Sequence, residues 1–402
     1  MAFTPVQIDG ANGIVFPSFA LDASLWYDSG ALWTVFLDKS SLKLETWRSK
    51  DGGLTWVAIG STISSAANLS LIGVTKRGPP IQAVLHEVVS GELEVWRFGN
   101  GWLAGGATEL LNGPVPVTAG SLLPRKWSIF KNSNPAGFDV FHRGADVGGL
   151  QRIYRSSYGY DSDTWGSAVE HGSGHAKSHA MIGSLAVRIH GSVIDRVHVF
   201  LGTPDGDILQ QTWSPVLGNQ TLQTLATADL EAGATTGVVA TVGAPTSYFE
   251  EDASVDNLLI AFPYAQTGGH LVMAVAEENR NPTWTIEQFA TSPEYNPGVM
   301  GSKIATISAV AFGAPEDLYA VWTSHDTPDK IYYSRRVLGS PPSWTDPVLH
   351  RAFGASESLA YLHAAPTPDG IGLIWQDGLS GNPTYDLIEL TRAATASRYS
   401  IQ

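Results

Sequence analysis

The sequence predicts an all-β fold: a single seven-bladed β-propeller of four-stranded antiparallel blades, closed by the N-terminal strand. Three observations predict it. Short apolar segments recur at a nearly constant interval, 42 Gly and 23 Pro are scattered between them, and one tight-turn motif with a Trp follows the first segments. Propeller blades give such a period, with about 40–50 residues plus loops for each sheet. The 402 residues then fit one large all-β domain.

Seven strand-like segments each end in a large apolar residue, and these ends lie 49 to 61 residues apart along the chain. The ends are Phe36, Leu85, Phe141, Leu201, Phe262, Trp322 and Trp375. Counted through the two termini, the interval from the last end back to the first is of similar size, as a ring requires. We therefore expect one blade per segment. The approximate blades are residues 12–63, 64–111, 112–172, 173–225, 226–291, 292–353, and 354–392 completed by 3–9.

A polar or Gly-containing turn follows most of these ends and leads into another alternating run, which is the antiparallel hairpin pattern. In five blades a Trp then opens a fourth strand. These are Trp56, Trp102, Trp165, Trp284 and Trp344. The seventh blade lacks such a Trp. We expect residues 4–8 to supply its outer strand, because that pairing joins the two ends of the chain and covers an open edge.

The tight-turn motif occupies residues 49–56, which run SKDGGLTW and match the Asp box, Ser-x-Asp-x-Gly-x-Thr-Trp. Its Asp and Ser bind turn amides, its Gly takes a positive φ, and its Trp packs between blades. Residues 157–165 form a degraded copy. The chain resembles the sialidase-like, BNR-repeat superfamily of propellers, which includes sialidases and several polysaccharide lyases. That resemblance implies a propeller scaffold and activity on glycans.

Composition excludes several classes of function. The formal net charge is -14, from 38 acidic and 24 basic residues, and no run of Lys and Arg is present to follow a nucleic-acid backbone. No stretch is apolar enough to span a membrane, and the absence of Cys excludes disulfides and thiolate chemistry. We expect a soluble protein without a cofactor, whose partner is a carbohydrate or another small molecule. The N-terminus lacks signal-peptide features, and secretion or a cytoplasmic location stays open.

The candidate site follows from the topology of a four-stranded blade. Loops that join second to third strands share one face of the molecule with the loops between blades, so the residues after the seven apolar ends form a ring at the propeller mouth, where ligands bind. Candidate substrate-binding residues in this ring are Asp38, Glu87, Tyr264, His325, Asp326, Gln376 and Asp377.

Three further residues of the ring are the candidate catalytic residues: His86, His142 and Arg143. A neutral His removes a proton and Arg binds a carboxylate bidentately, which is the chemistry of β-elimination from a uronate. Residues 138–144, FDVFHRG, resemble the strand and Gly-rich turn of BNR-type lyases. The resemblance implies a lyase. A sialidase is disfavoured, because residues 14–17 hold no Arg where that family has its first one.

A second group of histidines has ligand-like spacing at His171, His175 and His179. Gly172 and Gly174 make this segment a loop, so we expect no metal site. Three functions stay open. They are an exo-acting lyase or glycosidase at the mouth, a non-catalytic lectin, and a small-molecule enzyme with an apolar propeller pocket. Candidate lectin residues are Trp96, Arg97, Trp213, Tyr332 and Tyr333.

Overall fold

The computed structural model describes most of the chain's predicted strands, and every structural statement below concerns the residues it describes. These are residues 3–8, 24–38, 43–61, 69–75, 81–87, 93–98, 109–110, 128–133, 136–143, 150, 152–159, 164–173, 175–177, 180–188, 195–203, 206–214, 216–226, 241–252, 255–265, 270–291, 307–313, 316–324, 329–339, 341–354, 359–377 and 382–390.

Within these residues the chain forms seven antiparallel sheets, numbered here in chain order. Sheet 1 contains β2 (Ser24–Asp28), β3 (Ala31–Asp38), β4 (Lys43–Ser49) and β5 (Val57–Ser61). Sheet 2 contains β6 (Leu69–Thr75), β7 (Ile81–Glu87), β8 (Leu93–Phe98) and β9 (Glu109–Leu110). Sheet 3 contains β10 (Ser128–Ser133), β11 (Ala136–Arg143), β12 (Ile153–Gly159), β13 (Thr164–Trp165) and β14 (Val169–His171).

The remaining sheets repeat this order. Sheet 4 contains β15 (Ala180–Arg188), β16 (Asp195–Gly202), β17 (Ile208–Ser214), β18 (Gly218–Asn219) and β19 (Gln223–Ala226). Sheet 5 contains β20 (Thr241–Val242), β21 (Thr246–Asp252), β22 (Val255–Ala265), β23 (His270–Glu277) and β24 (Thr285–Thr291). Sheet 6 contains β25 (Ile307–Phe312), β26 (Asp317–Ser324), β27 (Lys330–Val337), β28 (Ser343–Trp344) and β29 (Val348–Ala352). Sheet 7 contains β30 (Leu359–Thr367), β31 (Gly370–Asp377), β32 (Pro383–Glu389) and, from the N-terminus, β1 (Val6–Gln7).

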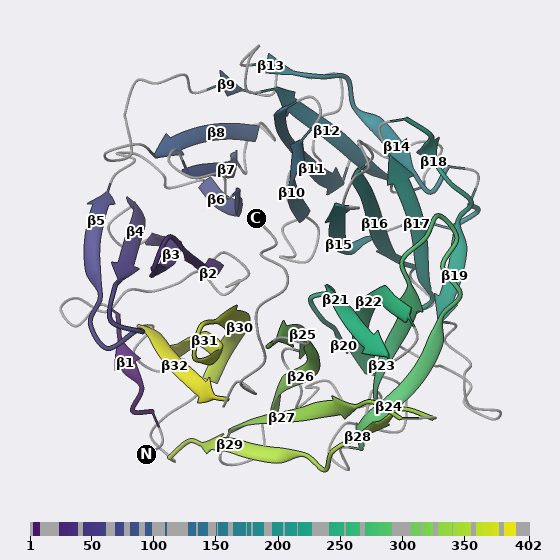
Figure 1. The fold of residues 1–402 in the computed structure, drawn as a ribbon. Coiled ribbons are helices and arrows are strands. Elements are labelled where there is room, and N and C mark those ends of the chain that lie inside the picture. The colour runs from purple at the N-terminus through teal and green to yellow at the C-terminus, as the bar shows by residue number, and fades with distance from the viewer. Residues whose placement is uncertain are drawn as a thin grey trace.

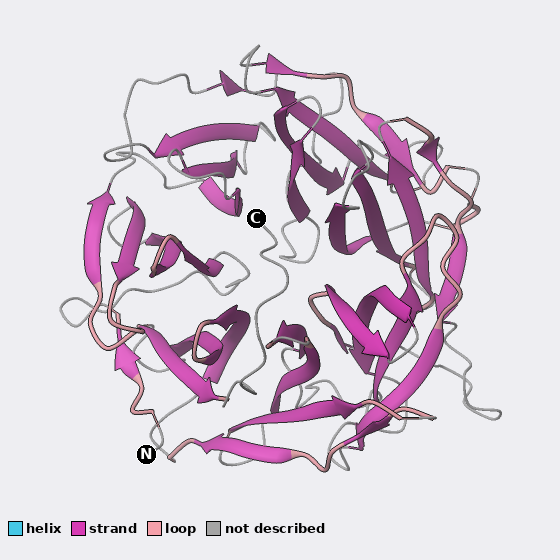
Figure 2. Cartoon of the chain, viewed as in Figure 1, coloured by secondary structure: helices cyan, strands magenta, loops and turns pink. Residues whose placement is uncertain are grey.

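Each sheet follows a four-stranded plan, and a fifth strand arises where one of the four positions is split. In sheets 3, 4 and 6 two short outer strands pair with the same third strand, and in sheet 5 two segments pair with the second strand. All the described secondary-structure elements are strands, joined by loops and turns (Figure 2). The predicted all-β class and antiparallel four-stranded sheets are therefore confirmed. Within the described residues, no helix is long and apolar enough to cross a membrane.

The sheets surround a common centre, with their first strands innermost (Figure 1). Each sheet contacts the next in chain order, and β30 of sheet 7 lies against β2 of sheet 1. All seven predicted apolar ends lie on second strands: β3, β7, β11, β16, β22, β26 and β31. The strand order thus places the ends of these second strands on one face, together with the connections between sheets.

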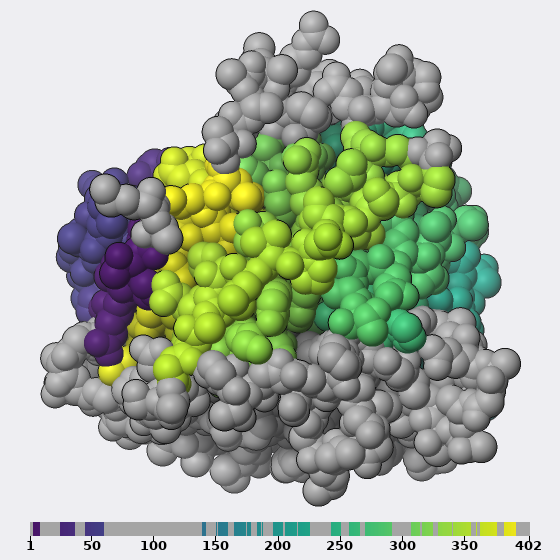
Figure 3. All heavy atoms as spheres, turned by 90° about the horizontal axis from the view of Figure 1, so that it is seen from below, coloured from purple at the N-terminus to yellow at the C-terminus, as the bar shows by residue number. Residues whose placement is uncertain are grey.

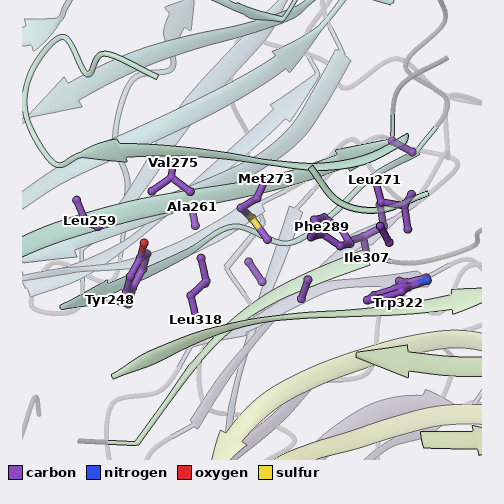
Figure 4. Close-up of a cluster of buried hydrophobic side chains, with 14 residues drawn as sticks. Tyr248, Leu259, Ala261, Leu271, Met273, Val275, Phe289, Ile307, Leu318 and Trp322 are labelled. Atoms are coloured by element: carbon purple, nitrogen blue, oxygen red, sulfur yellow. The ribbon is translucent and has the colours of Figure 1, made fainter. Parts of the chain in front are cut away.

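Apolar side chains fill the spaces between neighbouring sheets. The cluster between sheets 5 and 6 contains Met273, Phe289, Leu318 and Trp322 among its buried members (Figure 4). Similar clusters join sheet 6 to sheet 7 and sheet 7 to sheet 1. Because neighbouring sheets cover both faces of the inner strands, β17 and β23 are buried along nearly their whole length.

The N-terminal segment pairs with the last sheet. Val6 lies opposite Tyr385 and Gln7 opposite Thr384 on β32, and the Ile8 amide donates to the Pro383 carbonyl at 2.9 Å. Figure 3 shows this purple segment beside the yellow C-terminal strands. The pairing occurs within residues 4–8, where the sequence predicts an outer strand.

The turn at residues 49–56 is held by its own side chains. Ser49 Oγ donates to Asp51 Oδ1 at 2.7 Å and accepts from the Gly53 amide at 2.8 Å. Both the amide and the hydroxyl of Thr55 donate to Asp51, at 2.9 and 2.5 Å. These bonds to the ionised form hold the pKa of Asp51 at about 2, below its ordinary 3.8.

This turn also packs against sheet 7. The Trp56 indole donates to the Gly53 carbonyl at 3.1 Å, and its ring centroid lies 5.4 Å from that of Tyr385 on β32. Phe3 contacts the same tyrosine, with ring centroids 5.5 Å apart. Tyr385 therefore contacts both the turn at residues 49–56 and the N-terminal segment, and links them to sheet 7.

Candidate functional site

The structure fixes the backbone positions of most of the predicted ring residues. Asp38 ends β3, Glu87 ends β7, Arg143 ends β11 and Asp377 ends β31. The residues just before three of these ends are His86, His142 and Gln376. His325 and Asp326 lie outside the described residues.

The two histidines occupy corresponding positions in neighbouring sheets. His86 directly follows the apolar end Leu85, and His142 directly follows Phe141. On the third strands, Leu93 is opposite His86 and Tyr154 is opposite His142. The first strands of these two sheets, β6 and β10, contact each other. The backbone therefore brings both strand ends to adjoining places on the same face.

The side chain of Tyr264, another predicted ring residue, is completely buried. The cause is the length of β22, which continues past Phe262 to Ala265. Tyr264 pairs with Val272 inside the sheet, and its ring centroid lies 6.3 Å from that of Phe262. Its hydroxyl does not face solvent.

Two histidines of the predicted group, His171 and His175, lie within the described residues. His171 is buried on β14 against Phe141, with ring centroids 5.0 Å apart. Burial, and next the charge of Arg155, lower its pKa to about 3, so the imidazole is neutral near pH 7. The carbonyl of His175 accepts from Arg152 at 2.8 Å. His179 lies outside the described residues, and no three His, Cys, Asp or Glu of the described part could hold a metal ion.

Charged side chains form a buried network between sheets 4 and 5. Arg196 donates to both carboxylate oxygens of Glu278 at 3.2 and 3.0 Å. His198 lies 3.1 Å from the same carboxylate through Nε2, and its Nδ1 lies 3.1 Å from Gln210 Nε2. His198 is fully buried. Both imidazole nitrogens therefore serve the packing of the two sheets and do not face a substrate.

A second network joins sheets 5 and 6. Arg336 donates through Nε and Nη2 to Glu287, both at 2.8 Å, and through Nη1 to Glu250 at 2.7 Å. The Trp344 indole donates to Glu287 at 3.0 Å. Burial raises the pKa of the adjacent Tyr248 above its ordinary value. No sequence motif marks either network, because the partners lie about 50 to 90 residues apart along the chain.

Three of the predicted lectin residues, Trp213, Tyr332 and Tyr333, pack against other side chains of the protein. Trp213 is 5% exposed, and the Arg155 guanidinium lies 3.4 Å from its ring centroid. Tyr332 stacks on Trp322 with ring centroids 5.8 Å apart. One face of each of these two rings is therefore covered by a neighbouring side chain. Trp96 and Arg97 lie on β8, and Tyr333 packs against the cluster between sheets 6 and 7.

Antiparallel sheets around a common centre, each with its second-strand end on one face, define the β-propeller class. Similarity to a solved structure agrees: the β-propeller domain of Cps50 (Swd1) from Myceliophteria thermophila has a TM-score of 0.50 and 9% identity, with 96% of this chain and 100% of that chain covered. No family model and no curated protein sequence matches the chain.

Two further solved structures are similar at lower scores. The α-L-arabinofuranosidase Arb93A from Fusarium graminearum, in complex with an iminosugar inhibitor, has a TM-score of 0.44 and 10% identity, with 96% of this chain and 98% of that chain covered. The Aleuria aurantia lectin in complex with alpha-methyl-L-fucoside has a TM-score of 0.43 and 15% identity, with 84% and 97% covered.

Proposed function

We propose that this chain is one seven-bladed β-propeller, closed by its N-terminal strand, that cleaves an acidic carbohydrate at the face where the second strands end. One observation carries the proposal: His86 and the pair His142 and Arg143 stand at corresponding strand ends of adjoining sheets. The contact between β30 and β2 and the pairing of β1 with β32 support the closed ring.

The proposed reaction is β-elimination from a uronate. One imidazole removes the proton on the carbon next to the carboxylate, and the electron pair forms a double bond as the glycosidic oxygen leaves. The second imidazole gives a proton to that oxygen. Arg143 binds the carboxylate bidentately and stabilises the negative charge that develops on it. The products are a new reducing end and an unsaturated uronate.

The other ring residues bind the sugar hydroxyls in this proposal. Asp38, Glu87 and Asp377 accept hydrogen bonds from them, and Gln376 both donates and accepts. His325 and Asp326, which directly follow β26 along the chain, complete the proposed set. Tyr264 supports the ring from within sheet 5.

A panel of uronate polysaccharides, monitored by the ultraviolet absorbance of the unsaturated product, tests the proposal. H86A and H142A should each lose about a hundredfold or more in kcat, the usual contribution of a general acid or base. R143K should raise KM and lower kcat, because Lys lacks the bidentate fork. R335K, at an exposed position paired with Asp317, is the matched control and should retain full activity.

Three outcomes would contradict the proposal. Turnover that survives both His substitutions would place the chemistry elsewhere. Binding of the polysaccharides without any product would make the protein a lectin. An absence of both binding and turnover would leave the small-molecule enzyme as the surviving alternative.

A further inference from the structure

Three polar side chains meet where β29, the outer strand of sheet 6, lies beside β32, the third strand of sheet 7. His350 and Arg351 are neighbours on β29, and both bind Asp386 on β32. His350 Nε2 lies 2.9 Å and Arg351 Nε 2.8 Å from Asp386 Oδ2. The Asp386 side chain is completely buried, while those of His350 and Arg351 are 14% and 27% exposed. One buried carboxylate thus holds both basic side chains, and each of them is partly exposed at the surface.

A β-bulge makes this arrangement possible. Consecutive residues of a regular strand point to opposite faces, so His350 and Arg351 would normally diverge. Here Arg351 pairs with Ile331 and Leu349 pairs with Tyr332, which leaves His350 as an extra residue. A bulge turns both side chains toward the same side and is a common way to re-aim a side chain at a functional site.

Other outer strands show what the fold places at such a bulge. The extra residues in sheets 1, 4 and 5 are Ile59, Leu225 and Phe289. Leu225 and Phe289 are buried in the hydrophobic clusters between sheets. His350 departs from this apolar pattern. Buried ion pairs stabilise a protein no better than well-packed apolar residues. Stability alone therefore does not explain why His350 occupies a position where these other sheets have an apolar residue.

The outward-facing atoms define what the cluster can bind. In the tautomer that donates Nε2–H to Asp386 Oδ2, Nδ1 carries a lone pair directed away from the carboxylate. Arg351 uses only Nε, and among the described residues its two terminal nitrogens have no hydrogen-bond partner. Its guanidinium lies 5.9 Å from the ring centroid of Trp375. The cluster therefore presents a fork of donors next to an acceptor, beside an aromatic ring.

We propose that this cluster is a second binding site, for the carboxylate and a ring hydroxyl of an acidic sugar. The Arg351 fork fits the two oxygens of a carboxylate, and His350 Nδ1 accepts from the hydroxyl. The inference takes its substrate class from the proposed function, but it uses other residues on the outer edge of the molecule. A site there holds a long acidic polymer without occupying the mouth.

Calorimetric titration of the full chain with glucuronate tests the site in an R143Q background, which removes the guanidinium of the mouth. Glucuronate should bind, and glucose should not. R351Q should weaken binding about tenfold or more, the loss expected for a bidentate charge-assisted contact. R335Q, on β27 of the same sheet and paired with Asp317, is the control and should bind as before. H350F restores an apolar bulge and should keep the melting temperature while losing binding.

Several results would overturn the inference. One is an absence of glucuronate binding in the R143Q background. Another is glucuronate binding by R351Q or H350F that is as tight as binding by the R143Q parent. Lactate carries a carboxylate and a hydroxyl without a sugar ring, and binding of lactate as tight as that of glucuronate would refute recognition of a sugar. H86A changes a residue of the mouth alone. Loss of turnover in H86A with retained glucuronate binding at this site would therefore separate the two proposals.

Discussion

Replacement of Gly53 by Ala tests how the turn at residues 49–56 packs against sheet 7. Gly53 has a φ of +99°, and a Cβ at this position would lie 2.0 Å from the ring of Tyr385. A left-handed backbone costs a non-glycine residue about 1–2 kcal/mol, and overpacking a core costs about 1–3 kcal/mol. G53A should therefore destabilise the protein by about 2–5 kcal/mol, the sum of these two effects.

The expected change in melting temperature follows from the length of the chain. An unfolding entropy of about 2.1 cal/mol/K per residue gives about 0.8 kcal/mol/K for the whole chain, so G53A should lower the Tm by about 2–6 °C. Gly30 is the matched control, because its φ is +78° and no atom lies within 4 Å of an added Cβ. G30A should lower the Tm by only about 1–2 °C. If calorimetry finds G53A no worse than G30A, the contact with Tyr385 does not exist as described.

Other predictions concern charged groups. D51N should lower stability by about 1 kcal/mol, because the amide cannot accept both bonds from Thr55. The pKa of Asp51 is about 2 when folded and about 3.8 when unfolded, so the carboxylate's contribution to the free energy of unfolding is present above pH 3.8 and lost as the pH falls toward 2. In urea unfolding experiments, D51N should not show this loss of stability. E287Q should cost about 1.5–3 kcal/mol, because it removes one of the two carboxylates that pair with the buried Arg336 and leaves Glu250, whereas E287M/R336M should cost less. The pKa of His171 is about 3 when folded and 6.5 when unfolded, so stability should fall as pH drops below 6.5, and H171L should weaken this dependence.

The strand series was predictable because alternation and period are local properties of the sequence. Each apolar end, such as Phe36 or Trp375, marks a second strand in the structure, since an inward-facing residue there must be large to fill the space between sheets. The turn at residues 49–56 was predictable for a similar reason: its hydrogen bonds all join residues within four positions of each other.

Contacts between sheets were beyond sequence reasoning. His198 and Glu278 are 80 residues apart, and no pattern in the chain pairs them. His350 and Arg351 are adjacent, so strict alternation would place them on opposite faces; only the bulge unites them at Asp386.

Within the proposed site, the backbone placement of the strand ends followed from the topology. The burial of Tyr264 did not, because nothing in the sequence shows that β22 continues three residues beyond Phe262. The length of a strand depends on its partners, and these come from other parts of the chain.

The most direct test of the proposed function is a crystal structure of the H142A variant with a uronate oligosaccharide. The account predicts the sugar at the ends of β7 and β11, with its carboxylate on Arg143 and the carbon next to the carboxylate facing the vacated place of the imidazole. An oligosaccharide bound only between the outer strands of two sheets, with the strand ends of sheets 2 and 3 unoccupied, would contradict the claim that this face is catalytic.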